Sequence, residues 1–468
     1  MSMPPGSGSD GSRESGAQPQ GDPTFLAQLA VLRAAFERKG VRLGVGYNAE
    51  GAPAYVFEEG HVLTRERHLD EVMPALGGRG ITNAAQIGEP VAGVVRIAVG
   101  GTSVLETVAA AEDALGRRGM VTPNHIVSVA PQGKCPADEP IPAPGPGVPL
   151  GTPQQDVVNP QRNLATNIGA GIKVTVIDNG LAEKYDVDFS WLLDGVTGDV
   201  VPDDGVIGPY EGHGTFIAGL LRCVAPALHV HVSADLADAG AMTELDFCGA
   251  LLNALPAGDA PAIISVSAGG TTAGNVPYLG LDAVIDALNA HPQTLLVAAA
   301  GNNGNQVPFW PAALAGPYPQ PTPGVLSVGA LRQDGAGIAC FSNYGPWVNV
   351  YAPGERLVGV FGSGTYTYTE PPSADCRYHT SPRLYDDCTC RGTPAQGSTG
   401  SFTGLATWSG TSFATPIVAA IIATRMWQTG ETSRQAAQAL IAGAGSVLGA
   451  GPALLPLLWT PTPVEPGT

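Results

Sequence analysis

Charged side chains are scarce in this sequence, and basic ones are the scarcest. Charged residues make up 14% of the 468 positions, and 23 Lys and Arg are outnumbered by 41 Asp and Glu, which gives a formal net charge of −18. A chain of that charge is repelled by phosphate backbones and by anionic lipid surfaces. We therefore expect neither nucleic acid nor a membrane among its partners.

Long apolar runs are lacking as well. The longest, 416–424 and 452–459, fall well short of the roughly 20 residues that span a bilayer. The first 22 residues are rich in Gly, Ser, Pro and Gln, without the apolar core that a secretion signal needs. The sequence therefore predicts a disordered tail over 1–23 and a cytoplasmic protein, and it leaves export by another route open.

Cysteine is rare, and its count of seven is odd, so at least one thiol has no partner within a monomer. Cys223 and Cys248 lie in apolar helical patterns, which predicts core positions. The other notable group lies in one polar stretch whose C-x₂-H-x₈-C-x-C spacing offers four zinc ligands. A disulfide or free thiols explain that group as well, so no metal site is predicted, and the candidates are Cys376, His379, Cys388 and Cys390.

What the sequence has in quantity is glycine and proline, 63 and 42 residues, which is typical of many tight turns. Residues 24–131 predict a small α/β domain that contains a βαβ unit. The stretch 132–160 is rich in Pro and Gly and predicts a linker. Helical spacing covers 26–36 and 103–117, and strand patterns cover 42–47, 53–64, 91–99 and 124–131.

Residues 161–450 alternate between apolar strand patterns and helical patterns, and 451–468 read as a tail. Strands that are apolar throughout are expected when helices cover both faces of a sheet, so the pattern predicts a three-layer, mostly parallel α/β fold. An extra stretch at about 362–403 interrupts it and could overhang a site. Strands are predicted at 172–177, 228–233, 262–267, 294–300 and 325–330, and helices at 213–223, 243–255, 280–290, 412–427 and 432–442.

One short segment combines a serine with the start of an apolar helix. Gly410-Thr411-Ser412 is followed by Phe413-Ala414-Thr415-Pro416 and an apolar run. Ser412 would then lie at a helix N-terminus, where free backbone N–H groups favour developing negative charge. A serine hydroxyl becomes a good nucleophile only when a base removes its proton. The simpler interpretation of this segment alone is a helix cap.

Two upstream segments could supply that base and its partner. His213 opens a helical pattern between two glycines, and Asp178 closes the apolar pattern at 172–177. An imidazole transfers protons near neutral pH, and a carboxylate can fix its tautomer. Taken singly, a histidine that opens a helix and an aspartate in a turn are more often structural.

A fourth segment, LLVAAAGNNGN at 295–305, runs from a buried strand into Asn302. An amide at the end of a strand can donate a hydrogen bond to the oxyanion of a tetrahedral intermediate. Turn formation by Asn-Gly is the simpler interpretation of this segment alone. Four such segments in one chain, each at the end of a strand or helix, favour a base-assisted serine nucleophile over coincidence.

Together, the segments VIDNG, HGTFIAG, AAAGNNG and GTSFATP resemble the subtilisin-like serine protease family, in its order Asp, His, Asn, Ser. The resemblance covers about 165–445 and implies a three-layer subtilisin-like fold and a serine endopeptidase that acts on extended polypeptides. It implies that Ser412 is the nucleophile and His213 the general base. Asp178 would orient His213, and Asn302 would stabilise the oxyanion together with the backbone N–H of Ser412.

The resemblance also implies a substrate cleft. Ser267-Ala268-Gly269 is similar to the edge segment that pairs with the substrate backbone by β-augmentation. Ala268 and the stretch Ala300-Gly301-Asn302 would then line the primary specificity pocket. No cofactor is required by such a mechanism. Structural calcium is common in the family, but no loop of this chain can be assigned to it.

Several points stay open at this stage. Residues 24–131 are similar in size and placement to a family prodomain, although a recognition module or a scaffold fits as well. The main alternative function is a catalytically silent member of the fold that binds peptides. Nucleotide binding fits poorly, because the glycines of GAGIKVTVID precede the strand, whereas phosphate binding needs them after it. The sequence does not define the oligomeric state.

Overall fold

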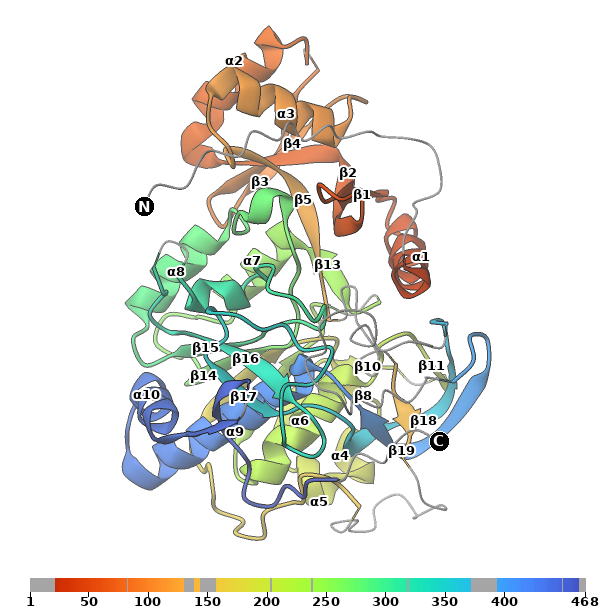
Figure 1. The fold of residues 1–468 in the computed structure, drawn as a ribbon, viewed down its shortest axis with the longest axis vertical. Helices are drawn as coiled ribbons and strands as arrows, with labels where there is room; N and C mark the ends of the chain where they lie inside the picture. The colour runs from red at the N-terminus through yellow and green to blue at the C-terminus, as the bar shows by residue number, and fades with distance from the viewer. Residues whose placement is uncertain are drawn as a thin grey trace.

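The computed structural model describes residues 22–81, 83–129, 139–143, 157–202, 204–236, 239–317, 320–371, 394–447 and 449–462. Figure 1 shows a small α/β unit built on β1 to β5 at one end of a larger α/β body. The two are joined by strand pairing, because β5 (Val121–Ser128) pairs antiparallel with β13 (Ala241–Thr243) of the body.

The small unit is an antiparallel sheet with two helices packed together over one face (Figure 1). Its strand order is β5-β2-β4-β3, and β1 also pairs with β2. Strand β2 therefore lies between β4 and β5, which do not pair with each other. The expected βαβ unit is therefore present in its split form, as in ferredoxin-like folds. The elements are β1 (Leu43–Tyr47), β2 (Pro53–Arg65), α2 (Leu69–Gly78), β3 (Ala85–Val91), β4 (Val94–Ala98) and α3 (Val104–Leu115).

The body is built on a nine-stranded sheet in the order β20-β21-β17-β16-β15-β14-β7-β12-β9. Every neighbouring pair in it is parallel except β20 with β21. The order reverses direction at β7, the first of these strands in the chain. The strands are β7 (Lys173–Ile177), β9 (Val196–Gly198), β12 (His229–Ser233), β14 (Ile263–Val266), β15 (Leu295–Ala299), β16 (Val325–Leu331), β17 (Val350–Pro353), β20 (Gly445–Val447) and β21 (Gly451–Ala453).

Helices lie on both sides of this sheet, with α7 and α8 toward the small unit and α9 with α10 on the other side (Figure 1). Strands β14, β15 and β16 are buried along their whole length, which explains their continuously apolar sequences. The predicted three-layer, mostly parallel fold is confirmed. The helices are α6 (His213–Val224), α7 (Glu244–Asn253), α8 (Leu281–Ala290), α9 (Thr411–Thr429) and α10 (Ser433–Gly443).

A second, smaller sheet contains the ends of the extra stretch expected at 362–403. It has the order β11-β18-β19-β6, and β18 and β19 form a long antiparallel hairpin. The four candidate ligands Cys376 to Cys390 lie outside the described residues. The strands are β6 (Ile141–Pro142), β11 (Val206–Ile207), β18 (Leu357–Thr367) and β19 (Thr399–Trp408), and a separate parallel pair joins β8 (Leu181–Ala182) to β10 (Val200–Val201) beside α4 (Tyr185–Asp188) and α5 (Ser190–Leu193).

Two of the expected boundaries are wrong. The tail predicted from 451 begins with β21, which pairs with β17 in the main sheet, and Trp459 beyond it is buried. Parts of the predicted linker 132–160 are also packed, since β6 pairs with β19 and Val158 is buried. In both stretches a few apolar side chains find partners far away in sequence, which composition alone does not show.

The core confirms the two cysteine predictions. Cys223 and Cys248 are buried in α6 and α7, and burial raises the pKa of the Cys223 thiol to about 12. Such thiols are neutral, unreactive core side chains at physiological pH. Across the described ranges, no helix combines the length and the apolar character needed to cross a membrane.

Candidate active site

The predicted site residues gather at one edge of the main sheet. Asp178 directly follows β7, Ser267 directly follows β14, and Asn302 lies three residues past the end of β15. In an open parallel sheet the carboxyl ends of the strands face the same edge, beside the point where the strand order reverses. His213 and Ser412 reach this edge as the first and second residues of α6 and α9.

Asp178 and His213 form a buried pair. The Nδ1 atom of His213 lies 2.9 Å from both carboxylate oxygens of Asp178, and the two side chains are 3% and 0% exposed. A carboxylate can only accept, so Nδ1 carries the proton, and Nε2 of the neutral ring is left as an acceptor. The pair therefore has the tautomer that a general base requires.

The start of α6 is fixed by contacts that bring the pair together. Asn179 accepts from the backbone N–H of Gly214 at 3.0 Å and donates to the carbonyl of Tyr210. A Cβ on Gly214 would lie 2.3 Å from the carbonyl oxygen of Gly180, so only glycine fits there. Asn179, which the sequence analysis does not single out, thus ties the strand of Asp178 to the helix of His213.

Tyr210 links this helix start, through Glu370, to helix α1 near the N-terminus. Its backbone φ is +62°, a sparsely populated conformation for a residue with a side chain, and its carbonyl accepts from the N–H of His213 at 3.2 Å. Its hydroxyl donates to Glu370 at 2.8 Å, and Glu370 also accepts from Gln28 of α1 (Pro23–Glu37) at 3.0 Å. Burial and the Glu370 carboxylate raise the pKa of Tyr210 well above its ordinary value, so the hydroxyl remains a donor at neutral pH.

Ser412 lies beside this pair but does not bond to it. Its Oγ donates to the carbonyl oxygen of Ser267 at 3.2 Å, and its own carbonyl accepts from Oγ of Ser267 at 2.7 Å. The ring of the next residue, Phe413, lies 5.2 Å from the ring of His213. The described contacts thus place the serine beside the histidine with its hydroxyl turned to another acceptor, and rotation about χ1 is the motion that would redirect it.

The side-chain amide of Asn302 is oriented by Thr411, whose part in the site the sequence did not reveal. Oδ1 of Asn302 accepts from both the backbone N–H and the hydroxyl of Thr411, each at 2.9 Å, and the same hydroxyl accepts from the N–H of Gly301 at 3.0 Å. Because Oδ1 has two donors, Nδ2 must occupy the other side of the amide. Among the described residues Nδ2 has no hydrogen-bond partner, so it is available to a bound group.

Aromatic rings enclose the imidazole. Trp408 packs edge-on against His213 with ring centroids 5.3 Å apart, and Phe413 packs against the same ring. Trp408 and Phe413 are also in contact with each other, 5.1 Å between centroids. Such a shell excludes water, which strengthens the electrostatic interaction of the pair with any charge that develops nearby.

The segment 267–269, which is predicted to pair with the substrate backbone, is already paired with the end of β5. Ser128 and Gly269 exchange both backbone hydrogen bonds at 3.0 Å, and the N–H of Val129 donates to the carbonyl of Gly240 at 2.9 Å. On its other edge β5 pairs with β13. The small unit thus places a strand where the resemblance puts a substrate backbone, between two walls of the body.

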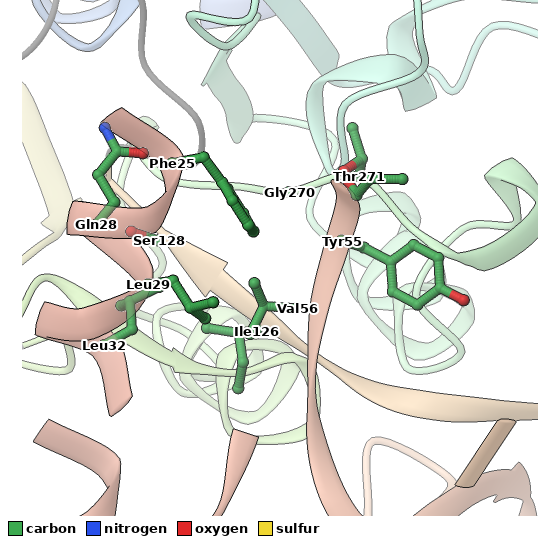
Figure 2. Close-up of a pocket in the computed structure, with 11 residues that line it drawn as sticks. Phe25, Gln28, Leu29, Leu32, Tyr55, Val56, Ile126, Ser128, Gly270 and Thr271 are labelled. Carbon is green, nitrogen blue, oxygen red and sulfur yellow. Dashed lines mark hydrogen bonds between the residues drawn. The ribbon is translucent and has the colours of Figure 1, made fainter. Parts of the chain in front are cut away.

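Helix α1 covers this strand from outside. Figure 2 shows Phe25 and Leu29 of α1 facing Val56 and Ile126 of the small sheet across a pocket whose far side is formed by the body. Gly270, next to the substrate segment, lies on that far side. The remaining pocket residues are Gln28, Leu32, Ala54, Tyr55, Ser128 and Thr271.

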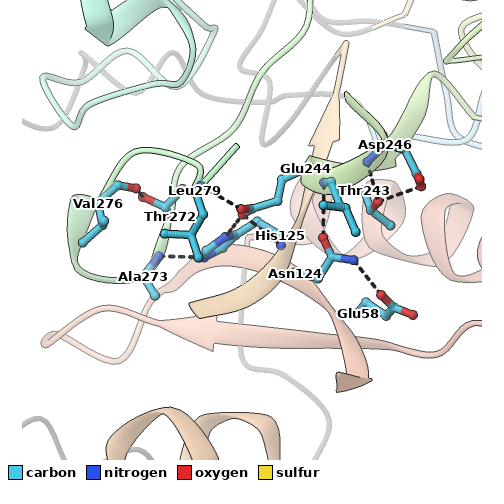
Figure 3. A network of polar contacts seen from close by, with 11 residues as sticks. Glu58, Asn124, His125, Thr243, Glu244, Asp246, Thr272, Ala273, Val276 and Leu279 are labelled. Carbon is cyan, nitrogen blue, oxygen red and sulfur yellow. Dashed lines mark hydrogen bonds and ion pairs between the residues drawn. The ribbon is translucent and has the colours of Figure 1, made fainter. Parts of the chain in front are cut away.

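A polar network holds β5 a few residues before the cleft (Figure 3). Nδ1 of His125 contacts the carboxylate of Glu244, and Nε2 accepts from the backbone N–H of Ala273 at 3.0 Å. Glu244 also accepts from the N–H of Leu279 at 3.2 Å. The His125 and Glu244 side chains are 2% and 1% exposed, so this contact between the small unit and the body is fully buried.

The described residues contain no group of three or more His, Cys, Asp or Glu side chains placed to hold a metal ion.

Comparison with known proteins identifies the family of this chain. Residues 169–449, more than half of the chain, match the sequence profile of the subtilase family, and the chain belongs to that family. The match includes all four candidate residues and confirms the resemblance found in the sequence. It begins after the small unit, which is outside the family profile.

Individual relatives carry protease names. A thermostable alkaline protease of Halalkalibacterium halodurans is 31% identical over 205 residues, which are 42% of this chain and 52% of that protein. A thermophilic serine proteinase of Bacillus sp. strain AK1 is 31% identical over 220 residues, 43% of this chain and 49% of that protein. The chain thus spans about half the length of these curated relatives.

A solved structure covers more of the chain. Fervidolysin from Fervidobacterium pennivorans, described as a keratinolytic enzyme related to subtilisin, is similar to 86% of this chain with a TM-score of 0.52 and 18% identity, and 60% of its own chain is covered. At that identity the similarity shows the fold alone. It extends beyond the family profile, so it includes part of the chain outside 169–449.

Proposed function

We propose that this protein is a serine endopeptidase that hydrolyses peptide bonds in extended polypeptides. The observation that carries the proposal is the buried contact of His213 Nδ1 with Asp178, which leaves Nε2 as an acceptor beside Ser412. Membership of the subtilase family and the protease names of its relatives support it.

The proposed reaction begins when a bound substrate turns the Ser412 hydroxyl from the Ser267 carbonyl to Nε2 of His213. Oγ then attacks the scissile carbonyl while Nε2 accepts its proton, and Asp178 stabilises the imidazolium. The oxyanion accepts from Nδ2 of Asn302 and from the backbone N–H of Ser412. The intermediate then collapses: the C–N bond breaks, His213 gives its proton to the leaving amine, and an acyl ester remains on Ser412. Water attacks this ester with His213 as the base, which releases the acid and restores the serine hydroxyl.

The small unit would inhibit this site within the same chain, because β5 occupies the position that the backbone of a substrate needs. This favours the prodomain among the three roles left open by the sequence, with the paired Ser128 and Gly269 as the supporting contact. The proposed mechanism requires no cofactor. Structural calcium remains an expectation, and no site is assigned to it.

The test is hydrolysis of a denatured protein by the full chain, with Ser412→Ala as the inactive control. Wild type is expected to cut the substrate and to shorten itself near 132–165, and Ser412→Ala to do neither. Ser128→Pro removes the N–H that donates to Gly269 and should speed both reactions. If wild type and Ser128→Pro leave the substrate intact, the protein is not an endopeptidase.

A second candidate is a silent subtilase fold that binds peptides. The hydrogen bond of Ser412 Oγ to the Ser267 carbonyl, away from the imidazole, is the observation that favours it. That protein would bind the same denatured polypeptide through the 267–269 segment and release it uncut, which the hydrolysis assay distinguishes directly.

A further inference from the structure

The predicted specificity pocket between the segments 267–269 and 300–302, called the slot below, is already filled in this protein. The cleft segment runs antiparallel to a bound strand, with Gly269 opposite one strand residue, as seen for Ser128. Two positions further along, a substrate residue would lie opposite Ser267, whose carbonyl oxygen is 3.2 Å from Ser412 Oγ. The side chain of that residue, on the acyl side of the scissile bond, would enter between the segments 267–269 and 300–302.

A phenylalanine ring lies between these two walls. A Cβ added to Gly269 would lie 2.4 Å from Cε1 of Phe309, and one added to Gly301 would lie 2.8 Å from Cδ2 of the same ring. Both glycines belong to the predicted pocket walls, and both face this one side chain. Phe309 is 2% exposed, so the ring fills the space instead of bordering it.

The ring cannot easily move out of the slot. The next residue, Trp310, exchanges both backbone hydrogen bonds with Gly270 at 2.9 and 3.1 Å, which fixes the backbone beside the ring. Trp310 itself is fully buried. Inserting a large side chain against a ring held this way forces displacement of packed neighbours, which well-packed interiors resist.

We propose that Phe309 limits the residue on the acyl side of the scissile bond to a small side chain, namely glycine, alanine or serine. The inference rests on the proposed peptidase function and names its substrate class. The carbonyl oxygen of Trp310 also faces Gly269 and the amide of Asn343 also faces Gly301, but Phe309 is the side chain that faces both glycines. Phe309 is thus a specificity-determining residue and takes no part in the bond-breaking steps.

The experiment compares tetrapeptide p-nitroanilides that differ only in the last residue, alanine, leucine or phenylalanine. Full-chain wild type and Phe309→Ala are assayed, each also with Ser128→Pro to free the cleft. Wild type is expected to favour alanine over phenylalanine by about 10²-fold in kcat/KM, the upper range for discrimination by an apolar pocket. Phe309→Ala should raise the phenylalanine-to-alanine ratio at least tenfold.

The matched control is Phe189→Ala, which removes a buried ring of the same size from the core near α5 and should leave the ratio unchanged. Turnover of the alanine substrate shows that each variant has folded, and Phe309→Val is the milder replacement if Phe309→Ala has not. A wild type that cleaves phenylalanine as well as alanine, or a ratio unchanged in a folded Phe309 variant, overturns the inference while leaving the peptidase function intact.

Diphenyl phosphonates derived from alanine and phenylalanine give the same ratio as rates of serine modification, without requiring turnover. A form that reacts with them but hydrolyses nothing is judged by that ratio. If no form reacts with either the anilides or the phosphonates, the proposed function itself fails, and the inference with it.

Discussion

Two buried histidines, each against a carboxylate, lie in different regions of this molecule. His213 contacts Asp178 within the body, and His125 of the small unit contacts Glu244 of the body. Burial is nearly equal, with side-chain exposures of 3% and 0% in the first pair and 2% and 1% in the second. In both pairs Nδ1 of the histidine contacts a buried carboxylate, so neither this contact nor burial separates a catalytic from a structural histidine.

The other ring nitrogen separates them. Nε2 of His125 accepts from the N–H of Ala273 at 3.0 Å, so both of its nitrogens are engaged in joining the small unit to the body. Nε2 of His213 has no hydrogen-bond partner among the described residues and lies near the first turn of α9. A histidine with both nitrogens engaged is a structural link, whereas one with a free acceptor can take a proton.

The largest expected effect comes from His213→Ala. Loss of the base should lower peptide turnover on the order of 10⁶-fold, a size measured in subtilisin and carried over here. His125→Ala is the comparison variant, and it should leave the chemical step intact because His125 touches no reacting group. Steady-state hydrolysis by the two variants in the Ser128→Pro background measures the difference, and equal losses would remove the distinction between the histidines.

Asn302→Ala should have the next largest effect. Turnover is expected to fall about 10²–10³-fold, the range measured for the corresponding donor of subtilisin. The amide acts on charge that exists only in the transition state, so kcat should fall while KM stays within about twofold. A variant that changes KM and spares kcat would show that Asn302 binds the ground state instead.

Prediction from the sequence was most successful where burial on both faces leaves a continuous apolar pattern, as in β14 and β15. It missed β3, an edge strand whose first five residues are exposed and carry no apolar alternation. It missed α2, which contains Pro74 and ends in glycines. Short apolar stretches such as Gly451–Ala453 were read as tail because their partner in β17 is distant in sequence.

At the site, the sequence identified the chemical groups but not their settings. The tautomer of His213, the orientation of Asn302 by Thr411 and the rotation of Ser412 toward Ser267 depend on contacts between residues that are 35, 109 and 145 positions apart. The occupation of the cleft by β5 depends on one pairing, Ser128 with Gly269, between residues with no local signal. The roles assigned to these residues remain predictions.

Glu244→Ala tests the structural histidine pair. It leaves Nδ1–H of His125 and the N–H of Leu279 without their buried acceptor, at a cost of about 1–3 kcal/mol. Hydrogen exchange should quicken in β5 and β13 and stay slow in β14 and β15. Asp178→Ala is the counterpart, expected to lower turnover about 10⁴-fold, less than His213→Ala, and to leave exchange in β5 unchanged. Faster β5 exchange in Asp178→Ala would contradict the separation.

Thr411→Val should have the smallest effect. It removes one donor to Asn302 and the acceptor for the N–H of Gly301 but keeps the backbone donor, so turnover should fall only about tenfold. Thr415→Val, one turn along α9 and equally buried, is the matched control and should change turnover less than twofold. Comparable losses in both would indicate general disturbance of the helix.

Labelling with a fluorophosphonate, followed by peptide mapping, is the most direct measurement of whether His213, through its Nε2 atom, activates a serine. The full chain and Ser128→Pro should each gain one adduct, on Ser412, and lose it in Ser412→Ala and His213→Ala but keep it in His125→Ala. An adduct on another serine, labelling that survives Ser412→Ala, or no adduct in either form would contradict the account.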